Sequence, residues 1–315
     1  MYSFGVQMFK KIELPFFVLK RYSQSLEMPI EMDSENIAAN LRMLAIKHFQ
    51  KYAFHSLYFN LKDQKSSENQ DMPIELTREA LVNQLIENRG GSCYHHNAAF
   101  QIILEANGIK SWFVSGLVHN PMQPEETFKM ATHIAIVFNY KEASYLFDPG
   151  WNGTTFSIYP LPSISGAMMR TENHQVRKTD NPDFPFTFEE IRPNGSIVPR
   201  FNFCSKETRL ENFRDAITYL NSEDYPFHTL FLFTRITSDE KIILFVNRRL
   251  IVKKINGDEL HNEELSEETS IIQKLTALFG ALDGFMEMIN ASDFKNPDLG
   301  HLICQTARST LTPTL

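Results

Sequence analysis

The sequence predicts an α+β fold in three parts, because helical and β-type patterns of apolar residues occupy different stretches of the chain. Apolar residues recur at helical spacing before residue 110, whereas β-type runs begin at Trp112. The last third combines β-type runs with one helical pattern. We therefore expect an N-terminal helical subdomain over 1–110, a central β-barrel-like subdomain over 111–215, and a C-terminal α/β lid with an extension over 216–315.

The N-terminal part contains two helical patterns that precede a glycine pair. Asp33–Tyr52 and Thr77–Glu87 both carry apolar residues at helical spacing, and the polar stretch 62–72 between them indicates a loop. The apolar run Leu14–Leu19 contains a proline and is too short for a signal-peptide core or a membrane span. We expect it to form a short packed extension.

The rest of the chain reads mainly as strands. Three β-type runs occupy the centre, and the polar, proline-bearing stretch 173–202 predicts long surface loops around a curved sheet. Three more β-type runs follow in the last third: His228–Ile236, Lys241–Val246 and Leu250–Ile255. A helix is expected from Ser266 to Gly280, while residues 284–315 show no chemistry that we can interpret.

Charge and cysteine content narrow the functional class. A formal net charge of −7 and a pI near 5.8 argue against an extended nucleic-acid-binding surface, although they allow a local basic pocket for a phosphorylated cofactor. The three cysteines, Cys93, Cys204 and Cys304, are odd in number and far apart, unlike the disulfide framework of a secreted protein. We expect a cytoplasmic protein without a membrane span.

Cys93 stands where a helix is expected to begin. It follows the pair Gly90-Gly91, which permits a sharp turn, and precedes apolar positions that suit a buried helix face ending at Asn107-Gly108. Unpaired amides and the positive end of the helix dipole favour a thiolate at such a position. Cys93 is therefore a candidate nucleophile rather than only a buried thiol.

Two further residues supply the partners that a nucleophilic cysteine needs. His133 opens one β-type run, Asp148 ends the next, and the short polar connection between the runs predicts a hairpin. Paired antiparallel strands would then carry His133 and Asp148 side by side at one end. A thiolate, a base and an acid that fixes the tautomer of the base are the parts of a catalytic triad.

The same residues carry a resemblance to a known family. The segment Arg89–Tyr94 followed by Asn97, then Thr132-His133, then Leu146–Trp151, resembles the three signature blocks of the arylamine N-acetyltransferases in order and spacing. Weaker similarity extends over about residues 20 to 283. The chain is identified on these motifs as a divergent member of that family.

The resemblance implies a cysteine-protease-like catalytic core and a ping-pong acyl transfer. Cys93 would take the acetyl group from acetyl-CoA, with His133 moving the proton and Asp148 orienting the imidazole. A small-molecule arylamine, hydrazine or hydroxylamine nitrogen would then accept it. Trp151 and Thr132 are implied as substrate-binding residues, since the position of Trp151 lines the acceptor pocket in the family. No metal is implied, and CoA contacts are expected in the lid strands and barrel loops without assignment to residues.

Two departures from the family pattern involve histidines. His55 and His95 occupy positions where the family usually carries glutamates, so the sequence does not show what supports the loop around Arg89. Zinc binding by His95 and His96 with His133 is disfavoured, because neighbouring residues on a helix point about 100° apart.

Three alternatives stay open at this point. An amide synthase would keep the triad and accept an acyl chain from another donor. A hydrolase or transglutaminase-like enzyme uses the same Cys, His, Asp order and differs in whether water or an amine resolves the intermediate. A relative that binds a partner or CoA without turnover is the third, suggested by His55 and His95.

Overall fold

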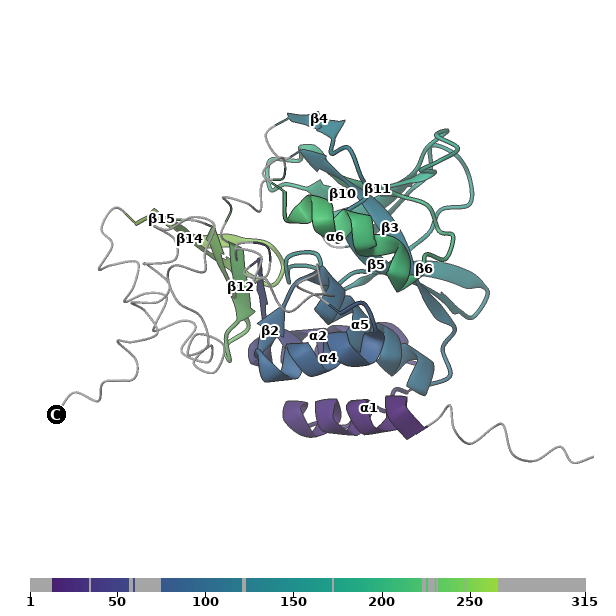
Figure 1. Cartoon of the computed structure of the whole chain (residues 1–315). Coiled ribbons are helices and arrows are strands. Elements are labelled where there is room, and N and C mark those ends of the chain that lie inside the picture. The colour runs from purple at the N-terminus through teal and green to yellow at the C-terminus, as the bar shows by residue number, and fades with distance from the viewer. Residues whose placement is uncertain are drawn as a thin grey trace, which may run out of the picture.

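The computed structural model describes residues 13–33, 35–56, 59, 75–120, 123–171, 173–222, 225, 230, 232–246 and 248–265 (Figure 1). The predicted loop at 62–72, the helix expected from residue 266 to 280 and the extension 284–315 lie outside these residues. Within the described part, no helix is long and apolar enough to cross a membrane.

Four helices form the N-terminal layer: α1 (Glu13–Leu26), α2 (Ile37–Lys51), α4 (Arg78–Glu87) and α5 (Cys93–Ala106). The sequence-based helices at α2, α4 and α5 are confirmed, and the short extension proves to be the helix α1, which buries Tyr22. In Figure 1 α1 lies beneath the layer of α2, α4 and α5. The residues of α5 from Cys93 to Leu104 are all buried, so this helix is the centre of the N-terminal layer.

A nine-stranded sheet occupies the middle of the chain and curves into a nearly closed barrel. Its strand order is β7-β6-β5-β3-β11-β10-β9-β8, with β4 paired to β3, and β7 lies near both β8 and β9. The strands are β3 (Ser111–Asn120), β4 (Gln123–Thr127), β5 (His133–Tyr140), β6 (Ala143–Phe147), β7 (Ile158–Pro160), β8 (Met168–Thr171), β9 (His174–Lys178), β10 (Phe186–Ile191) and β11 (Ile197–Phe203).

Helix α5 packs against this sheet. Phe100 of α5 meets Phe147 of β6 edge to face, with ring centroids 5.3 Å apart, and both side chains are fully buried. Burying one such side chain stabilises the fold by about 1.5–3 kcal/mol. The contact fixes the helix that begins at Cys93 against the hairpin of β5 and β6. A short 3₁₀ turn and helix α6 (Arg214–Leu220) then follow the barrel.

A six-stranded sheet joins the N-terminal part of the chain to the C-terminal part. Its order is β15-β14-β13-β12-β1-β2, formed by β1 (Ala53–His55), β2 (Gly90–Gly91), β12 (Leu232–Ile236), β13 (Lys241–Val246), β14 (Arg249–Lys254) and β15 (Glu259–Glu264). Strand β1 pairs with β12 antiparallel and with β2 parallel. The glycine pair before Cys93 is thereby held in a sheet whose other strands come from the C-terminal part. The boundaries at residues 110 and 215 stay predictions.

The predicted fold class is confirmed: the protein is α+β with helical, barrel-like and sheet-containing parts. The expectation of long surface loops over 173–202 is wrong in one respect, because three strands, β9 to β11, occupy most of this stretch. Their alternating aromatic side chains, among them Phe188 and Phe201, fill the barrel interior.

The parallel pairing of β1 with β2 predicts that position 90 accepts no side chain. The Cβ of Gly90→Ala would lie 2.2 Å from the Ala53 carbonyl oxygen, a backbone atom that cannot rotate away. We expect Gly90→Ala to lower the free energy of unfolding in urea by more than about 3 kcal/mol, the upper end of the usual cost of overpacking.

The matched control is Gly166→Ala. Gly166 has φ +77°, and a Cβ added there would meet no atom within 4 Å, so this substitution should cost only the backbone term of about 1–2 kcal/mol. Equal losses of stability in the two variants would contradict the β1–β2 pairing.

Candidate active site

Cys93 is the first residue of α5, as the sequence predicted, and is 8% exposed. Ser92 is the N-cap, and its backbone N–H donates to Nδ1 of His95 over 3.1 Å. A Glu or Gln usually makes this reverse contact in a capping box. His95 Nε2 lies 3.2 Å from Gln84 Oε1 on α4 and donates to it. The histidine therefore supports the turn before Cys93 at a position where the family usually has an acid.

The β5–β6 hairpin brings His133 and Asp148 together, and the sequence-based expectation of this contact is confirmed. His133 Nε2 donates to Asp148 Oδ2 over 2.6 Å, and the two side chains are 5% and 0% exposed. Cys93 acts on the same imidazole and raises its pKa. Since Nε2 is bound to Asp148, Nδ1 is the ring nitrogen left for the thiol.

The Asp148 carboxylate is held by neutral groups as well as by His133. Asn97 Nδ2 donates to Asp148 Oδ1 over 2.9 Å and to the Ile134 carbonyl over 2.6 Å. Asn97 Oδ1 accepts the Gly150 N–H over 3.2 Å, and the Thr155 hydroxyl donates to the Asp148 carbonyl. Asn97 lies one turn after Cys93, so a single helix face carries both residues.

The electrostatic surroundings keep His133 positively charged at neutral pH. Burial alone lowers the pKa of the imidazole, but the Asp148 carboxylate, its hydrogen bond and the neighbouring Cys93 raise it to about 10. A buried carboxylate 2.6 Å away outweighs desolvation here because it stabilises only the protonated ring. The site therefore holds an imidazolium beside a cysteine sulfur.

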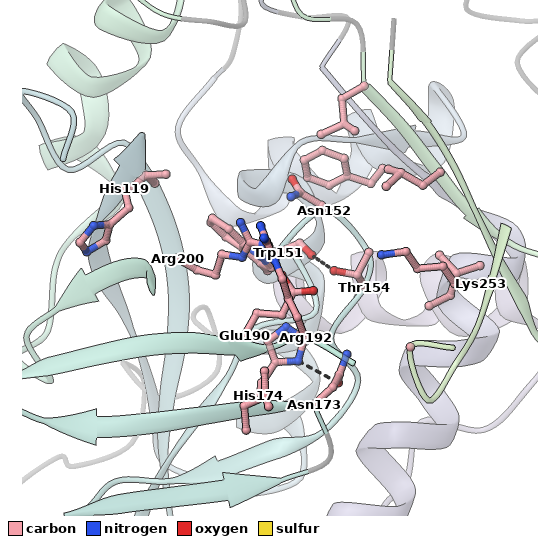
Figure 2. Close-up of a pocket in the computed structure, with 18 of the residues that line it drawn as sticks. His119, Trp151, Asn152, Thr154, Asn173, His174, Glu190, Arg192, Arg200 and Lys253 are labelled. Atoms are coloured by element: carbon pink, nitrogen blue, oxygen red, sulfur yellow. Dashed lines mark hydrogen bonds and ion pairs between the residues drawn. The ribbon is translucent and has the colours of Figure 1, made fainter. Parts of the chain in front are cut away.

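A cavity of about 1100 Å³ is lined by Cys93, His133, Thr132 and Trp151. The Trp151 indole meets His133 edge to face at 5.0 Å, and Phe201 lies 5.2 Å from the indole. In Figure 2 Trp151 occupies the centre of the cavity wall. The cavity thus combines a reactive thiol with an aromatic surface.

Two hydrogen bonds hold Thr132 in place in the cavity wall. Its hydroxyl donates to the Tyr225 hydroxyl over 3.3 Å, and its carbonyl accepts the Tyr94 hydroxyl over 2.8 Å. Thr132 is 2% exposed. These bonds fix the backbone just before His133.

A chain of neutral histidines lies behind the loop that carries Cys93. His96 Nε2 donates to the Gly91 carbonyl over 2.9 Å, so its Nδ1 accepts from His48 Nε2 at 2.6 Å. His48 Nδ1 is then left to accept the Tyr22 hydroxyl of α1. The bonds share one direction, and they connect α1 and α2 to the strand before Cys93.

The second departure from the family pattern, His55, is buried on β1. Its ring stacks on Phe233 of β12, with centroids 5.4 Å apart. Burial, with a smaller effect of His96, lowers the pKa of His55 to about 3, so the ring is neutral. Among the described residues, no group of three or more His, Cys, Asp or Glu side chains is arranged to hold a metal ion.

The structure therefore brings the five predicted site residues to one place: Cys93, Thr132, His133 and Trp151 line the cavity, and Asp148 lies directly behind His133. From the sequence, Asn97 was recognised only as part of a motif, and Thr155 and Phe201 were not recognised. The helical spacing of Cys93 and Asn97 was the available signal for Asn97. Nothing in the sequence marks Thr155 or Phe201.

A family model described as N-acetyltransferase matches residues 38–282, and no curated protein sequence matches significantly. The arylamine N-acetyltransferase from Mycobacterium marinum, solved in complex with CoA, is 19% identical with a TM-score of 0.69; the match covers 91% of this chain and 99% of that one.

Two further solved structures show the same fold. The arylamine N-acetyltransferase from Salmonella typhimurium is 16% identical with a TM-score of 0.67, over 91% of this chain and 98% of that one. The enzyme from Bacillus cereus, described as having a unique Cys-His-Glu catalytic triad, is 21% identical with a TM-score of 0.64, over 84% and 98% of the two chains.

The family model defines the class as N-acetyltransferase, on a fold with a cysteine-protease-like core. The family model spans most of the chain, which establishes that the chain is a member of the family. The chain belongs to the arylamine N-acetyltransferase family, and the low identities mark it as a divergent member.

The buried neutral histidines predict loss of stability in acid. Burial, the largest cause in each case, lowers the pKa of His55, His96 and His174 to about 3, whereas an unfolded histidine titrates near 6.5. Between these values the unfolded chain binds more protons. The contribution of these three groups is therefore full above pH 6.5 and falls as the pH drops from 6.5 toward 3, by about 1.4 kcal/mol per pH unit for each group.

Urea unfolding at pH 7.5, 6.5, 5.75 and 5 measures this dependence. His174→Gln removes one of the titrating groups. Below pH 6.5 the free energy of unfolding of this variant should therefore fall less steeply with decreasing pH, by the contribution of one proton, than that of the unmodified chain. Stability that does not change between pH 6.5 and 5 would contradict the neutral state of these histidines.

Proposed function

We propose that this chain transfers the acetyl group of acetyl-CoA to the nitrogen of an arylamine, hydrazine or hydroxylamine by a ping-pong mechanism, with Cys93, His133 and Asp148 as catalytic triad. The observation that carries the proposal is the position of His133, which donates to Asp148 over 2.6 Å and lies with Cys93 on the wall of a large cavity. The CoA complex of the M. marinum relative and the triad described for the B. cereus relative support it.

The first half-reaction uses the imidazolium to hold a thiolate. The Cys93 sulfur attacks the thioester carbonyl, and the negative charge on the carbonyl oxygen is stabilised by backbone amides near the start of α5. The bond from the carbonyl carbon to the CoA sulfur then breaks. The departing CoA thiolate takes the proton of His133, which leaves an acetyl-cysteine and a neutral imidazole.

The second half-reaction runs in the reverse sense. The amine nitrogen attacks the carbonyl carbon of acetyl-Cys93, and neutral His133 takes a proton from that nitrogen. The carbon–sulfur bond breaks, the acetylated amine leaves, and the imidazolium and the Cys93 thiolate are restored. Asp148 keeps the ring in one orientation and stabilises its charged form throughout.

The aromatic wall favours an aromatic acceptor. We assign Trp151 as the residue on which the acceptor ring packs, because its indole borders both the cavity and His133. Thr132 is assigned to substrate binding through its place in the wall beside His133. The proposed steps use no metal.

The proposal also places the protein in the cytoplasm. Cys93 and Cys204, the two cysteines within the described residues, are both free. A nucleophilic thiol persists in a compartment that keeps thiols reduced.

Intact-protein mass spectrometry after incubation with acetyl-CoA tests the proposal. We expect one acetyl group, mapped by peptide analysis to Cys93 and lost when an aromatic amine or hydrazine is added. Cys93→Ala should carry no acetyl group, and Asp148→Asn should acetylate more slowly by on the order of a thousandfold, because the imidazole loses its tautomer and charge partner.

The matched control is Cys204→Ala, which should acetylate at the rate of the unmodified chain because Cys204 is remote from the triad in sequence and does not line the cavity. Acetylation of Cys204 instead of Cys93 would refute the proposed nucleophile. Loss of the acetyl group to water at the same rate with and without amine would identify a hydrolase.

A further inference from the structure

Among the described residues, four cations that the triad does not use line the same cavity as Cys93. Three of them, Arg192, Arg200 and Lys253, lie close enough to influence one another, and Arg170 is the fourth. Arg200 lies on β11, Arg192 in the turn between β10 and β11, and Lys253 on β14, so two different sheets contribute. In Figure 2 the Lys253 side chain points toward Thr154, while Arg192 and Arg200 lie on the other side of that residue, beside Trp151. Arg200 and Lys253 are half-buried in the cavity wall, whereas Arg192 lines the cavity and is also exposed to solvent.

Carboxylates neutralise this cluster only in part. Arg200 forms an ion pair with Glu190, yet its Nε is buried without a hydrogen-bond partner. Within the part of the chain that the structure describes, neither Arg192 nor Lys253 has a carboxylate within ion-pair distance.

Asp258 and Glu259 also line the cavity, and Asp258 pairs with Lys254. With four cations and three carboxylates among the described residues of its wall, the cavity keeps an excess of positive charge and one buried donor, Arg200 Nε, without a partner.

The effects on neighbouring groups show that these charges act on one another. Burial lowers the pKa of Lys253; Glu259 opposes this, and the nearby Arg200 and Arg192 lower it further. Burial, then Arg200 and Lys253, lowers the pKa of His174 to about 3, so that ring stays neutral. Three like charges held together are a favourable environment for an anion.

The wall that presents the cluster is built from packed turns. Gly257, in the β14–β15 turn with φ +95°, sits against Asn173 beside β9, where a Cβ would lie 2.9 Å from Asn173 Nδ2. Asn173 Oδ1 in turn lies 3.0 Å from His174 Nδ1. This contact brings β14 of one sheet against the edge of the barrel, so Lys253 and Arg200 border the same space.

We propose that Arg192, Arg200 and Lys253 bind the phosphate groups of the CoA thioester while its thioester end reaches Cys93. The inference rests on the proposed function and assigns the donor contacts to residues. Phosphate oxygens match the guanidinium donors and carry the negative charge that the cluster lacks. A chain with net charge −7 repels a polyanion elsewhere, so local cations are needed to hold one.

An acidic group on the acceptor would present the same chemistry as a donor phosphate. The cavity of about 1100 Å³ has room for a donor and an acceptor beside the same thiol. Binding of CoA alone, without an acceptor, separates the two sources.

Calorimetric titration of CoA into the unmodified chain and its variants gives a readout that does not depend on turnover. We expect the double variant Arg192→Ala/Lys253→Ala to bind CoA at least tenfold more weakly, and Lys253→Arg to retain binding within about threefold because it keeps the charge. Arg200 is left in place, since its removal would strand Glu190.

The matched control is Lys241→Ala. Lys241 is an exposed lysine on β13 of the same sheet, it pairs with Asp239 over 2.7 Å, and neither residue lines the cavity. Its removal changes the net charge by the same amount as the loss of Lys253, and it should leave CoA affinity unchanged. If the control variant lost as much CoA affinity as Lys253→Ala, overall charge would explain the effect, and the assignment would be overturned.

A second experiment compares two acetyl donors, acetyl-CoA and the phosphate-free thioester S-acetyl-N-acetylcysteamine. The ratio of kcat/KM for acetyl-CoA to that for the short thioester should fall at least tenfold in the double variant. An unchanged ratio with unchanged CoA affinity would overturn the proposal, as would an effect confined to the KM of the acceptor. Failure of either donor to acetylate Cys93 would refute the proposed function, while the titration would still decide the phosphate site.

Discussion

The buried ion pair between His133 and Asp148 is the interaction on which the site depends. A carboxylate with no exposed surface is costly unless its oxygens have hydrogen-bond donors, and here two elements supply them: His133 of β5 and Asn97 of α5. The turn after Asp148 adds to this indirectly, because the Gly150 N–H donates to Asn97 and the Thr155 hydroxyl donates to the Asp148 backbone carbonyl. Helix, hairpin and turn must therefore pack together before the buried carboxylate has its partners. The same packing sets Cys93, one turn before Asn97, against the imidazole.

Burial alone does not decide the charge of a histidine in this protein. His133 is charged because a carboxylate accompanies it, whereas His48, His55, His95 and His96 surround the strand before Cys93 without one and are held neutral. Neutral rings can both donate and accept, and so they can support the glycine pair in a directed chain. His95 shows how such a ring takes over a bond that an acid usually makes at a helix start.

The sequence predicted those parts of the site that depend on local pattern. The helix start at Cys93 follows from its glycines and apolar spacing, and the contact of His133 with Asp148 follows from a hairpin. The contacts that it could not show are long-range. Strand β1 has three residues and pairs with β12, about 180 positions away, so no local pattern marks it. Arg192 and Lys253 border the same cavity because of how two sheets pack together. The periodicity of apolar residues along the sequence does not indicate that packing.

Nuclear magnetic resonance of the chain with ¹⁵N-labelled histidine tests the central claim most directly, because ring nitrogen shifts report the protonation of each imidazole. His133→Asn identifies the His133 signals by their loss. The account predicts that these signals stay those of an imidazolium from pH 6 to beyond pH 9, since Asp148 and Cys93 raise the pKa of the ring to about 10. Deprotonation of His133 near pH 6.5, the value of a free histidine, would contradict it.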